Sequence, residues 1–140
     1  MKRAVAFIDG GSRGNPGPAG FGVRIEDEEG RVVAEIRGAL GVATNNVAEY
    51  RGLLAALTHL AAHEFRVVRI RSDSELLVKQ MRGEYRVRHP NLLPLHRQAR
   101  ELVSSLERVT FEHIPREANT EADRLANLAI DEAASRPDHS

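Results

Sequence analysis

The chain has 140 residues, of which 41% are hydrophobic, and its formal net charge is zero. This length suits a single domain with a real core, and the apolar content excludes a disordered chain. The absence of cysteine excludes disulfides and thiolate chemistry. The apolar runs are too short to span a membrane and the first residues lack the core of a signal peptide, so we expect a cytoplasmic protein with no membrane partner.

The charges are unevenly distributed along the chain. Residues 66–100 hold nine Lys or Arg against three acids, whereas residues 101–140 hold nine acids against four Arg. A locally basic segment can follow the phosphates of a nucleic acid, although ordinary solvated surface explains most of these residues taken singly. The zero net charge itself argues mildly against a generic nucleic-acid binder.

The apolar periodicity predicts the element order βββαβααβα, with the first three strands forming an antiparallel meander. The expected strands are residues 4–8, 21–25, 31–40, 66–71 and 109–114, and the expected helices are residues 47–62, 75–83, 92–106 and 120–134. This order predicts an α/β fold, namely a five-stranded mixed sheet with helices on both faces.

Asp9 closes the first predicted strand and precedes a segment rich in glycine. Residues 10–20 contain five glycines and two prolines, and we expect them to form a loop. A loop with few side chains lets the backbone approach a bulky ligand, and an acid beside it can bind a metal ion. The alternative is a tight turn in which Asp9 forms an Asx-turn.

Three further acids lie at the ends of predicted elements. Glu49 is in the first turn of the first helix, Asp73 follows the fourth strand and Asp123 opens the last helix. Helix capping is the alternative for the first two segments, because Asn46 with Glu49 and Ser72 with Glu75 both have capping-box spacing. The alternative for Asp123 is a favourable interaction with the helix dipole.

Taken together, Asp9, Glu49, Asp73 and Asp123 can meet at one edge of the sheet, where strand ends and helix starts lie close together. Four uncompensated carboxylates would repel one another strongly, and divalent cations offset that repulsion. Carboxylate and water ligands suit Mg²⁺ or Mn²⁺ rather than zinc. Two such ions sharing Asp9 would hold an attacking water and a leaving oxygen in line across a phosphate.

Four short motifs follow one another along the chain. They are Phe7–Ser12 with Gly14–Gly17, Thr44–Glu49, Ser72–Ser74 and Ala118–Asp123. Over about residues 4–133, these motifs and their spacing resemble the type 1 ribonuclease H family. We therefore expect the ribonuclease H-like fold, with residues 1–134 as one catalytic domain and residues 135–140 as a flexible tail.

The resemblance implies endonucleolytic cutting of the RNA strand of an RNA–DNA hybrid, which leaves 5′-phosphate and 3′-hydroxyl ends. It implies two Mg²⁺ or Mn²⁺ ions when substrate is bound. Asp9 and Asp73 would bind the ion that activates water. Asp9, Glu49 and Asp123 would bind the ion beside the leaving 3′ oxygen.

The same matching implies substrate contacts. Asn15 and Thr44 would bind a phosphate of the DNA strand, and Asn45 and Asn46 would lie along the minor groove, where RNA displays its 2′-hydroxyls. Loop and cap chemistry is the alternative for the two adjacent asparagines. The glycine-rich segment supplies the remaining expected contacts, which are Gly10, Gly11 and Ser12.

The chain departs from many relatives in the segment of residues 82–91, which is too short for a basic helical handle. Arg86 and Arg88, with His89, are expected to stand in for part of it, so hybrid affinity should be modest. Glu75 occupies a position where relatives often carry an amide facing the minor groove. These features resemble the compact archaeal and actinobacterial branch, some of whose members also attack double-stranded RNA, which stays open as a second partner.

Many relatives also carry a catalytic histidine in a mobile loop before the last acid, and the short loop of residues 115–119 has none. His113 lies on the fifth predicted strand, where alternation predicts a structural role. Arg116 is the best candidate in this loop to act on the phosphate or on the product. We expect the protein to act as a monomer.

Two other classes of function remain alternatives. One is a non-catalytic domain that binds hybrids, although binding does not need four mutually repelling acids. The other is a relative that cuts another nucleic acid, such as a DNA junction resolvase or a transposase. The Thr44–Glu49 motif, which suits a strand bearing 2′-hydroxyls, favours the hybrid enzyme.

Overall fold

The computed structural model describes residues 2–135, and the remainder of the predicted tail lies outside the described residues. The predicted order of strands and helices is confirmed. The elements are β1 (Arg3–Ser12), β2 (Gly17–Glu26), β3 (Val32–Ala43), α1 (Asn45–Ala62), β4 (Val67–Ser72), α2 (Glu75–Met81), α3 (Leu93–Ser104), β5 (Arg108–His113), a 3-10 turn (Arg116–Ala118) and α4 (Thr120–Ala134).

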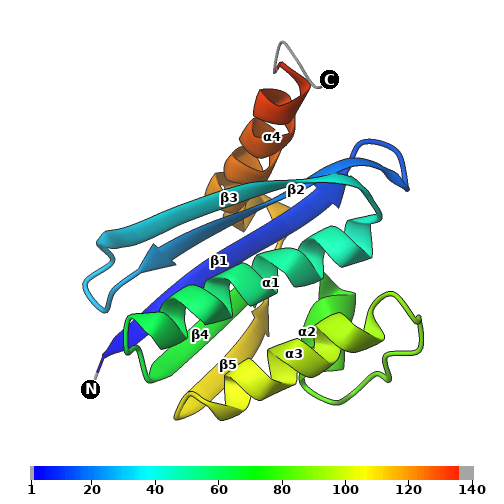
Figure 1. Cartoon of the computed structure of the whole chain (residues 1–140). Coiled ribbons are helices and arrows are strands. Elements are labelled where there is room, and N and C mark those ends of the chain that lie inside the picture. Colours follow the sequence, from blue (N-terminus) through cyan, green and yellow to red (C-terminus); the bar gives the residue numbers. More distant parts are fainter. Residues whose placement is uncertain (1, 136–140) are drawn as a thin grey trace.

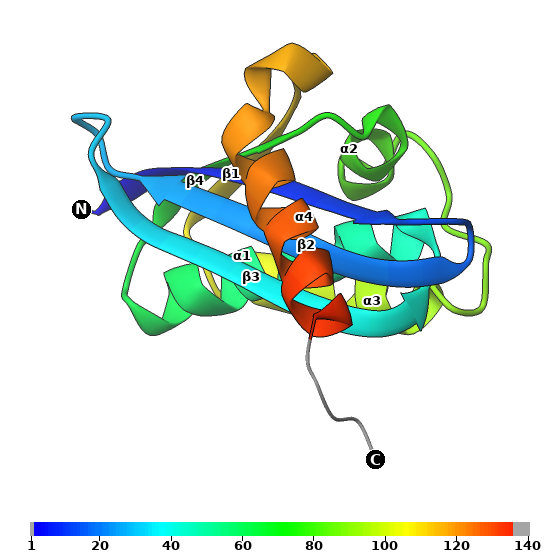
Figure 2. The ribbon, with the colours of Figure 1, turned by 90° about the horizontal axis from the view of Figure 1, so that it is seen from above.

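The five strands form one mixed sheet in the order β3-β2-β1-β4-β5. The pairs β1–β2 and β2–β3 are antiparallel, whereas β1–β4 and β4–β5 are parallel. Helices α1, α2 and α3 lie on one side of the sheet (Figure 1), and α4 crosses the opposite side over β2 and β3 (Figure 2). The predicted α/β fold with helices on both faces is therefore confirmed.

The core lies mainly between α1 and the sheet. Leu53, Leu57 and Leu60 are fully buried, as the predicted apolar stripe requires, and they pack in one cluster with Ile8 and Ile70. Burying a leucine side chain stabilises a fold by about 1.5–3 kcal/mol, so this stripe fixes α1 on the sheet. The position of Glu49 on α1 is thereby fixed as well.

The glycine-rich segment is not the loop that the sequence predicted. β1 continues through Gly10, Gly11 and Ser12, which pair with Phe21, Gly20 and Ala19 of β2. Only residues 13–16 turn between the two strands. The hydrogen bonds of a β-ladder join backbone groups and need no side chains. Pairing with β2 therefore outweighs the preference of glycine for loops in this segment.

The two capping boxes that were the alternatives for these segments are not formed. Thr44 is the N-cap of α1, and its hydroxyl accepts a hydrogen bond from the Val47 amide at 3.2 Å, which places Glu49 beyond the first turn. Ser74 caps α2 by accepting from the Leu77 amide at 3.2 Å. Capping, which was the main alternative for the segments of Glu49 and Asp73, therefore does not explain either acid.

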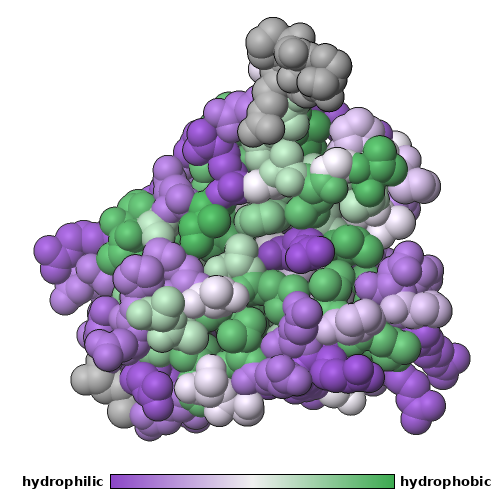
Figure 3. All heavy atoms as spheres, viewed as in Figure 1, coloured by the Kyte–Doolittle hydropathy of each residue, from purple (hydrophilic) through white to green (hydrophobic). Residues whose placement is uncertain are grey.

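The surface seen from the side of α1 is hydrophilic at its margins, and apolar atoms reach it over the middle, where β3 and α1 lie (Figure 3). Val32, Val33 and Val42 of β3 are among the exposed large apolar residues. Within residues 2–135, no helix combines the length and apolar character that crossing a membrane requires.

Candidate active site

The four predicted acids line one cavity of about 440 Å³. They come from four different elements: Asp9 from β1, Glu49 from α1, Asp73 from the turn after β4 and Asp123 from the first turn of α4. The cavity is mainly polar and its walls include no histidine. It therefore joins acids that are up to 114 positions apart in the sequence.

Asp9 and Asp73 are neighbours because of the parallel pairing of β1 with β4. The last paired residues are Ile8 and Ser72, so each acid directly follows the end of the shared ladder. β1 continues beyond this point and pairs only with β2. The carboxyl ends of parallel strands are where α/β folds place their sites, and Asp73 occupies such an end.

Glu49 reaches the site because α1 passes very close to β1. A Cβ atom on Gly10 would overlap the backbone of Ala48, so only glycine allows this approach. The Ser74 side chain at the start of α2 lies near Glu49 and lowers the pKa of this acid. The contact between Gly10 and Ala48 therefore determines where the second acid lies.

Burial and mutual repulsion perturb two of the acids. Burial is the largest cause that raises the pKa of Asp9 to about 8, followed by the charge of Asp73, a hydrogen bond and the charge of Asp123, and the charge of Glu49. Burial also raises the pKa of Glu49 to about 7, against the lowering effects of the Ser74 hydrogen bond and the Arg116 charge. Without a cation, the cluster therefore keeps protons at neutral pH.

The donor set of the cavity fits Mg²⁺ or Mn²⁺, because it offers several carboxylate oxygens and neither imidazole nor thiolate. Within residues 2–135, no three His, Asp or Glu side chains are already grouped closely enough to hold one ion. The charges of all three other acids raise the pKa of Asp9, so Asp9 lies near each of them. A bound cation would offset the repulsion that raises this pKa.

Asn45, one of the two predicted minor-groove asparagines, is held by β1 and the turn after it. The Ser12 amide and hydroxyl donate to Asn45 Oδ1 at 2.8 and 3.2 Å, and the Asn45 amide donates to Asn15 Oδ1 at 3.1 Å. The Ser12 amide fixes the orientation of the Asn45 side chain by binding its oxygen, so the Asn45 Nδ2 group is the part that can donate to a ligand. Asn46 lines the cavity beside it.

The remaining predicted contact residues divide into two groups. Gly10, Gly11 and Ser12 line the cavity, whereas Thr44 is the N-cap of α1 at its margin. Arg116 also lines the cavity, and its charge acts on Glu49.

Arg86 and Arg88 lie on the connector between α2 and α3, outside the walls of this cavity. Both are exposed, and the buried Val87 between them anchors the connector to the core. His113 is also outside these walls; its exposed side chain lies 4.0 Å from Glu75.

Asn119 is a residue of the site that the sequence reasoning missed. It is 1% exposed, and its Nδ2 donates to the Ile8 carbonyl at 2.9 Å and to Asp73 Oδ2 at 3.4 Å. It therefore joins β1, Asp73 and the start of α4. The available signal was its spacing, since Asn119 lies one helical turn before Asp123.

Asn127 was missed as well, one turn after Asp123. Its Nδ2 donates to the Asp123 carbonyl at 3.0 Å and to Asp123 Oδ1 at 3.4 Å. Arg13 donates to Asn127 Oδ1 at 3.2 Å and pairs with Asp131 at 2.7 Å. The orientation of the fourth acid therefore depends on a link between α4 and the β1–β2 turn.

Comparison with known proteins identifies the family to which the chain belongs. The sequence profile of a family described as Reverse transcriptase-like matches residues 7–129. Bifunctional protein Rv2228c of Mycobacterium tuberculosis is 51% identical over 136 residues, which cover 94% of this chain and 36% of that protein. The solved N-terminal RNase H domain of that protein superposes with a TM-score of 0.92 at 48% identity and covers 96% of this chain and 97% of the solved chain. The chain belongs to the type 1 ribonuclease H family.

Two further ribonucleases H are similar over nearly the whole chain. Ribonuclease HI of Halobacterium salinarum is 43% identical over 94% of this chain and 66% of its own length. LC11-RNase H1, isolated from compost and solved in complex with an RNA/DNA hybrid, has a TM-score of 0.90 at 43% identity, with 94% of this chain and 99% of that chain covered. The chain thus spans about a third of the mycobacterial relative but most of these ribonucleases H.

The connector between α2 and α3 agrees with a compact member of this family. Residues 82–92 contain no helix, so the structure has no helical handle between these two elements.

Proposed function

We propose that this chain is an endonuclease that hydrolyses the RNA strand of RNA–DNA hybrids and leaves 5′-phosphate and 3′-hydroxyl ends. The observation that carries the proposal is the single cavity lined by Asp9, Glu49, Asp73 and Asp123. The similarity of the chain to ribonucleases H also supports the proposal, since the structure of one of them was solved in complex with an RNA/DNA hybrid.

The four acids are proposed to hold two Mg²⁺ or Mn²⁺ ions once substrate is bound. When bound, such ions activate a water and neutralise charge at the scissile phosphate. The chain's own residues prepare this arrangement. Asn119 orients Asp73, Asn127 orients Asp123, and Arg116 offers a cation at the same cavity for the phosphate or the product.

Recognition of the hybrid is proposed to rest on the margin of the cavity formed by β1 and α1. Asn45 offers N–H donors, which suit the 2′-hydroxyl oxygens or base edges of a minor groove. Asn15 and Thr44 would bind a DNA phosphate, whereas Arg86 and Arg88 would add phosphate contacts farther along the duplex. Double-stranded RNA displays 2′-hydroxyls as well, so it is proposed as a second, weaker substrate.

The deciding experiment compares four matched substrates, RNA–DNA, RNA–RNA, DNA–DNA and single-stranded RNA, in Mg²⁺, in Mn²⁺ and in excess chelator. We expect products with 3′-hydroxyl ends from the hybrid, intact DNA duplex and no cleavage in chelator. Asp9→Asn is the matched inactive control, because it keeps the side chain's size and removes the shared charge. Full activity in chelator or in this variant would overturn the two-metal proposal.

Binding without cleavage would instead identify a non-catalytic hybrid-binding domain. Measuring hybrid affinity in Ca²⁺ alongside cleavage separates the two, since binding and hydrolysis are then scored independently. The cytoplasmic location and monomeric state remain predictions, which fractionation and light scattering would test.

A further inference from the structure

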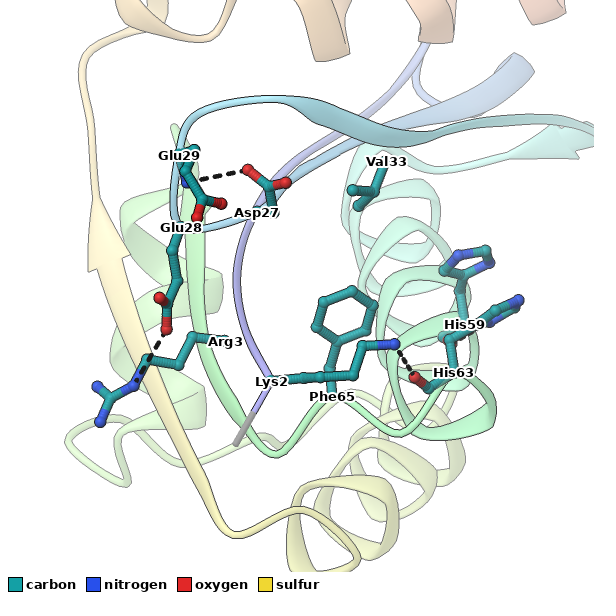
Figure 4. Close-up of a pocket in the computed structure, with 9 residues that line it drawn as sticks. All are labelled: Lys2, Arg3, Asp27, Glu28, Glu29, Val33, His59, His63 and Phe65. Carbon is teal, nitrogen blue, oxygen red and sulfur yellow. Dashed lines mark hydrogen bonds and ion pairs between the residues drawn. The ribbon is translucent and has the colours of Figure 1, made fainter.

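A second cavity, of about 420 Å³, lies at the opposite end of β1 from the four acids (Figure 4). Its cations contact other residues that line it. Lys2 donates to the His63 carbonyl at 2.7 Å. Arg3 lies 3.4 Å from Glu28. Neither contact involves a residue of the proposed function, whereas the contacts of Arg13, at the other end of β1, lead to one of the four acids.

Arg13 lies in the turn after β1, and its guanidinium contacts two residues of α4. Nη1 lies 2.7 Å from Asp131 Oδ1, and Nη2 donates to Asn127 Oδ1 at 3.2 Å. Asn127 and Asp131 are four residues apart on the helix, so they share one face and a planar guanidinium can contact both. The Arg13 amide donates to the Pro18 carbonyl at 2.8 Å, which fixes the backbone of the turn. Arg13 therefore places a donor at a fixed position against α4.

This donor determines which way the Asn127 amide faces. An arginine side chain carries only hydrogen-bond donors, so the oxygen of the amide has to face Arg13. The Asn127 Nδ2 group then faces Asp123, where it donates to the carbonyl at 3.0 Å and to Oδ1 at 3.4 Å. An ionised carboxylate can only accept hydrogen bonds. Arg13 and Asp123 thus require the same orientation of the amide that lies between them.

The turn that carries Arg13 is also attached to α1. Asn15 Oδ1 accepts a hydrogen bond from the Asn45 amide at 3.1 Å. Asn45 lies one helical turn before Glu49, just as Asn127 lies one helical turn after Asp123. Because α1 and α4 lie on opposite faces of the sheet, the turn connects the two helices that carry these acids (Figure 2).

We propose that Arg13 is a positioning residue, which sets the orientation of Asp123 through the Asn127 amide. The inference rests on the function proposed above, in which Asp123 is one of the acids that hold the metal ions. Asn127 is exposed, so without Arg13 its amide can turn over or bind water instead. An amide that has turned over presents its oxygen to Asp123 and repels the carboxylate.

The test compares Arg13→Ala, Arg13→Lys and Asn127→Ala with the parent chain. We expect kcat for the hybrid to fall about fivefold in both alanine variants, as the loss of one hydrogen-bonded link would cost, with a smaller change in KM. The two effects should not add in the double variant, because both substitutions break the same link. Lysine keeps the positive charge but lacks the planar fork, so Arg13→Lys should behave as Arg13→Ala does.

Arg37→Ala is the matched control for the packing of α4. Arg37 also joins the sheet to this helix through a fork, in which Nε and Nη2 donate to Glu132 at 2.7 and 2.9 Å. That contact involves neither Asn127 nor Asp131. We therefore expect Arg37→Ala to keep the kcat of the parent chain.

Two further measurements need no substrate. In NMR spectra of the metal-free protein, Arg13→Ala should shift the side-chain NH₂ signals of Asn127 and speed their exchange with water, whereas Arg37→Ala should not. In calorimetry without nucleic acid, Arg13→Ala should weaken Mn²⁺ binding, because the partners that orient a metal-binding carboxylate contribute to its affinity. Unchanged Asn127 signals or unchanged Mn²⁺ affinity would overturn the proposal.

The kinetic results can overturn it as well. A raised KM with parent-like kcat in Arg13→Ala would show that Arg13 contacts the substrate itself. Full activity of Arg13→Lys would show that charge alone suffices, and an equal loss in Arg37→Ala would show a general effect of α4 packing. A parent chain that cuts no hybrid would refute the proposed function, whereas the Asn127 signals and the Mn²⁺ affinity would still decide the role of Arg13.

Discussion

Gly22 lies directly opposite Asp9 in the antiparallel ladder of β1 and β2, and its missing side chain makes room for α4. A Cβ atom at this position would overlap the Ala122 carbonyl and crowd the Ala126 amide. The first turn of α4 can therefore pack on the strand beside Asp9. The proximity of Asp123 to Asp9, which raises the pKa of Asp9, depends on this contact.

The first prediction is that Gly22→Ala separates α4 from the sheet. The added methyl group meets backbone atoms, which cannot move aside as a flexible side chain would. We expect a loss of about 1–3 kcal/mol in the free energy of unfolding, as is typical of overpacking, together with at least tenfold slower cleavage. Urea unfolding and a hybrid cleavage assay measure the two effects.

Gly11→Ala is the matched control for stability, because a Cβ there would meet only the Asn45 side chain at an ordinary 3.7 Å. We expect this control to unfold near the parent's midpoint. Gly22→Ala with parent-like stability would show that α4 is not packed against Gly22 as described.

The second prediction concerns the connector arginines. Arg86→Ala combined with Arg88→Ala should weaken hybrid binding and reduce the logarithmic slope of its salt dependence by roughly 1.8, the value for losing two phosphate contacts on a duplex. Turnover at saturating substrate should change little, since both side chains lie outside the cavity of the acids. Affinity measured over a series of salt concentrations tests this.

Arg66→Ala serves as its control, because Arg66 is exposed just before β4, at the other end of that strand from Asp73. An unchanged salt slope in the double variant would mean that the connector faces away from the duplex.

The third prediction is that Arg116→Ala slows turnover more than it weakens binding. Arg116 lines the cavity, and its charge lowers the pKa of Glu49. Its loss should cost about tenfold in kcat, which corresponds to about 1.4 kcal/mol, with a small change in KM. Arg124→Ala, an exposed arginine of α4 that pairs with Glu35 and Glu121, is the control. Parent-like kcat would remove Arg116 from the reaction.

Much of the fold could be predicted from the sequence because apolar periodicity records which face of each element is buried. The stripe of α1 and the bounds of α4 follow from it directly. The glycine-rich segment was different, because glycine is typical of loops and the pairing with β2 that makes it a strand is a long-range property. The helix N-caps could not be predicted either. Several neighbouring polar residues could each have capped the helix, and the backbone conformation at Thr44 and Ser74 decides which of them does.

In the candidate site, too, some residues could be predicted from the sequence and others depend on tertiary packing. The four acids could be proposed because each stands beside a strand end or a helix start, and the motifs fixed their order. Their supporting partners could not be proposed, since Asn119 reaches the Ile8 carbonyl only through tertiary packing. Likewise, nothing in the sequence says that Gly22 must face Asp9, because that depends on the register of β1 with β2.

The last prediction is that Asp73→Asn abolishes cleavage and yet stabilises the metal-free protein. The substitution keeps the side chain's size, so packing survives, and it removes one of the proposed ligands. In the metal-free state the charge of Asp73 is the second cause, after burial, of the raised pKa of Asp9. Removing it should recover about 1 kcal/mol, on the order of one pKa unit.

The pH dependence follows from the direction of this shift. The pKa of Asp9 rises from 3.8 to about 8 on folding, so the folded state binds more protons than the unfolded state. Asp9 therefore contributes stability below about pH 4 that is lost as the pH rises towards 8. In chelator, the advantage of Asp73→Asn over the parent should accordingly grow between these values and level off above them.

Thermal unfolding of both proteins across this pH range, in chelator and in Mg²⁺, tests the prediction. Saturating Mg²⁺ should shrink the difference, because the parent gains more from binding than the variant does. Asn119→Ala, which removes the partner of Asp73 but none of the charge, should instead destabilise the protein at every pH by leaving the buried Ile8 carbonyl without its donor. A variant Asp73→Asn that still cuts the hybrid, or that is less stable than the parent in chelator at pH 8, would contradict a repelling cluster of metal-binding acids.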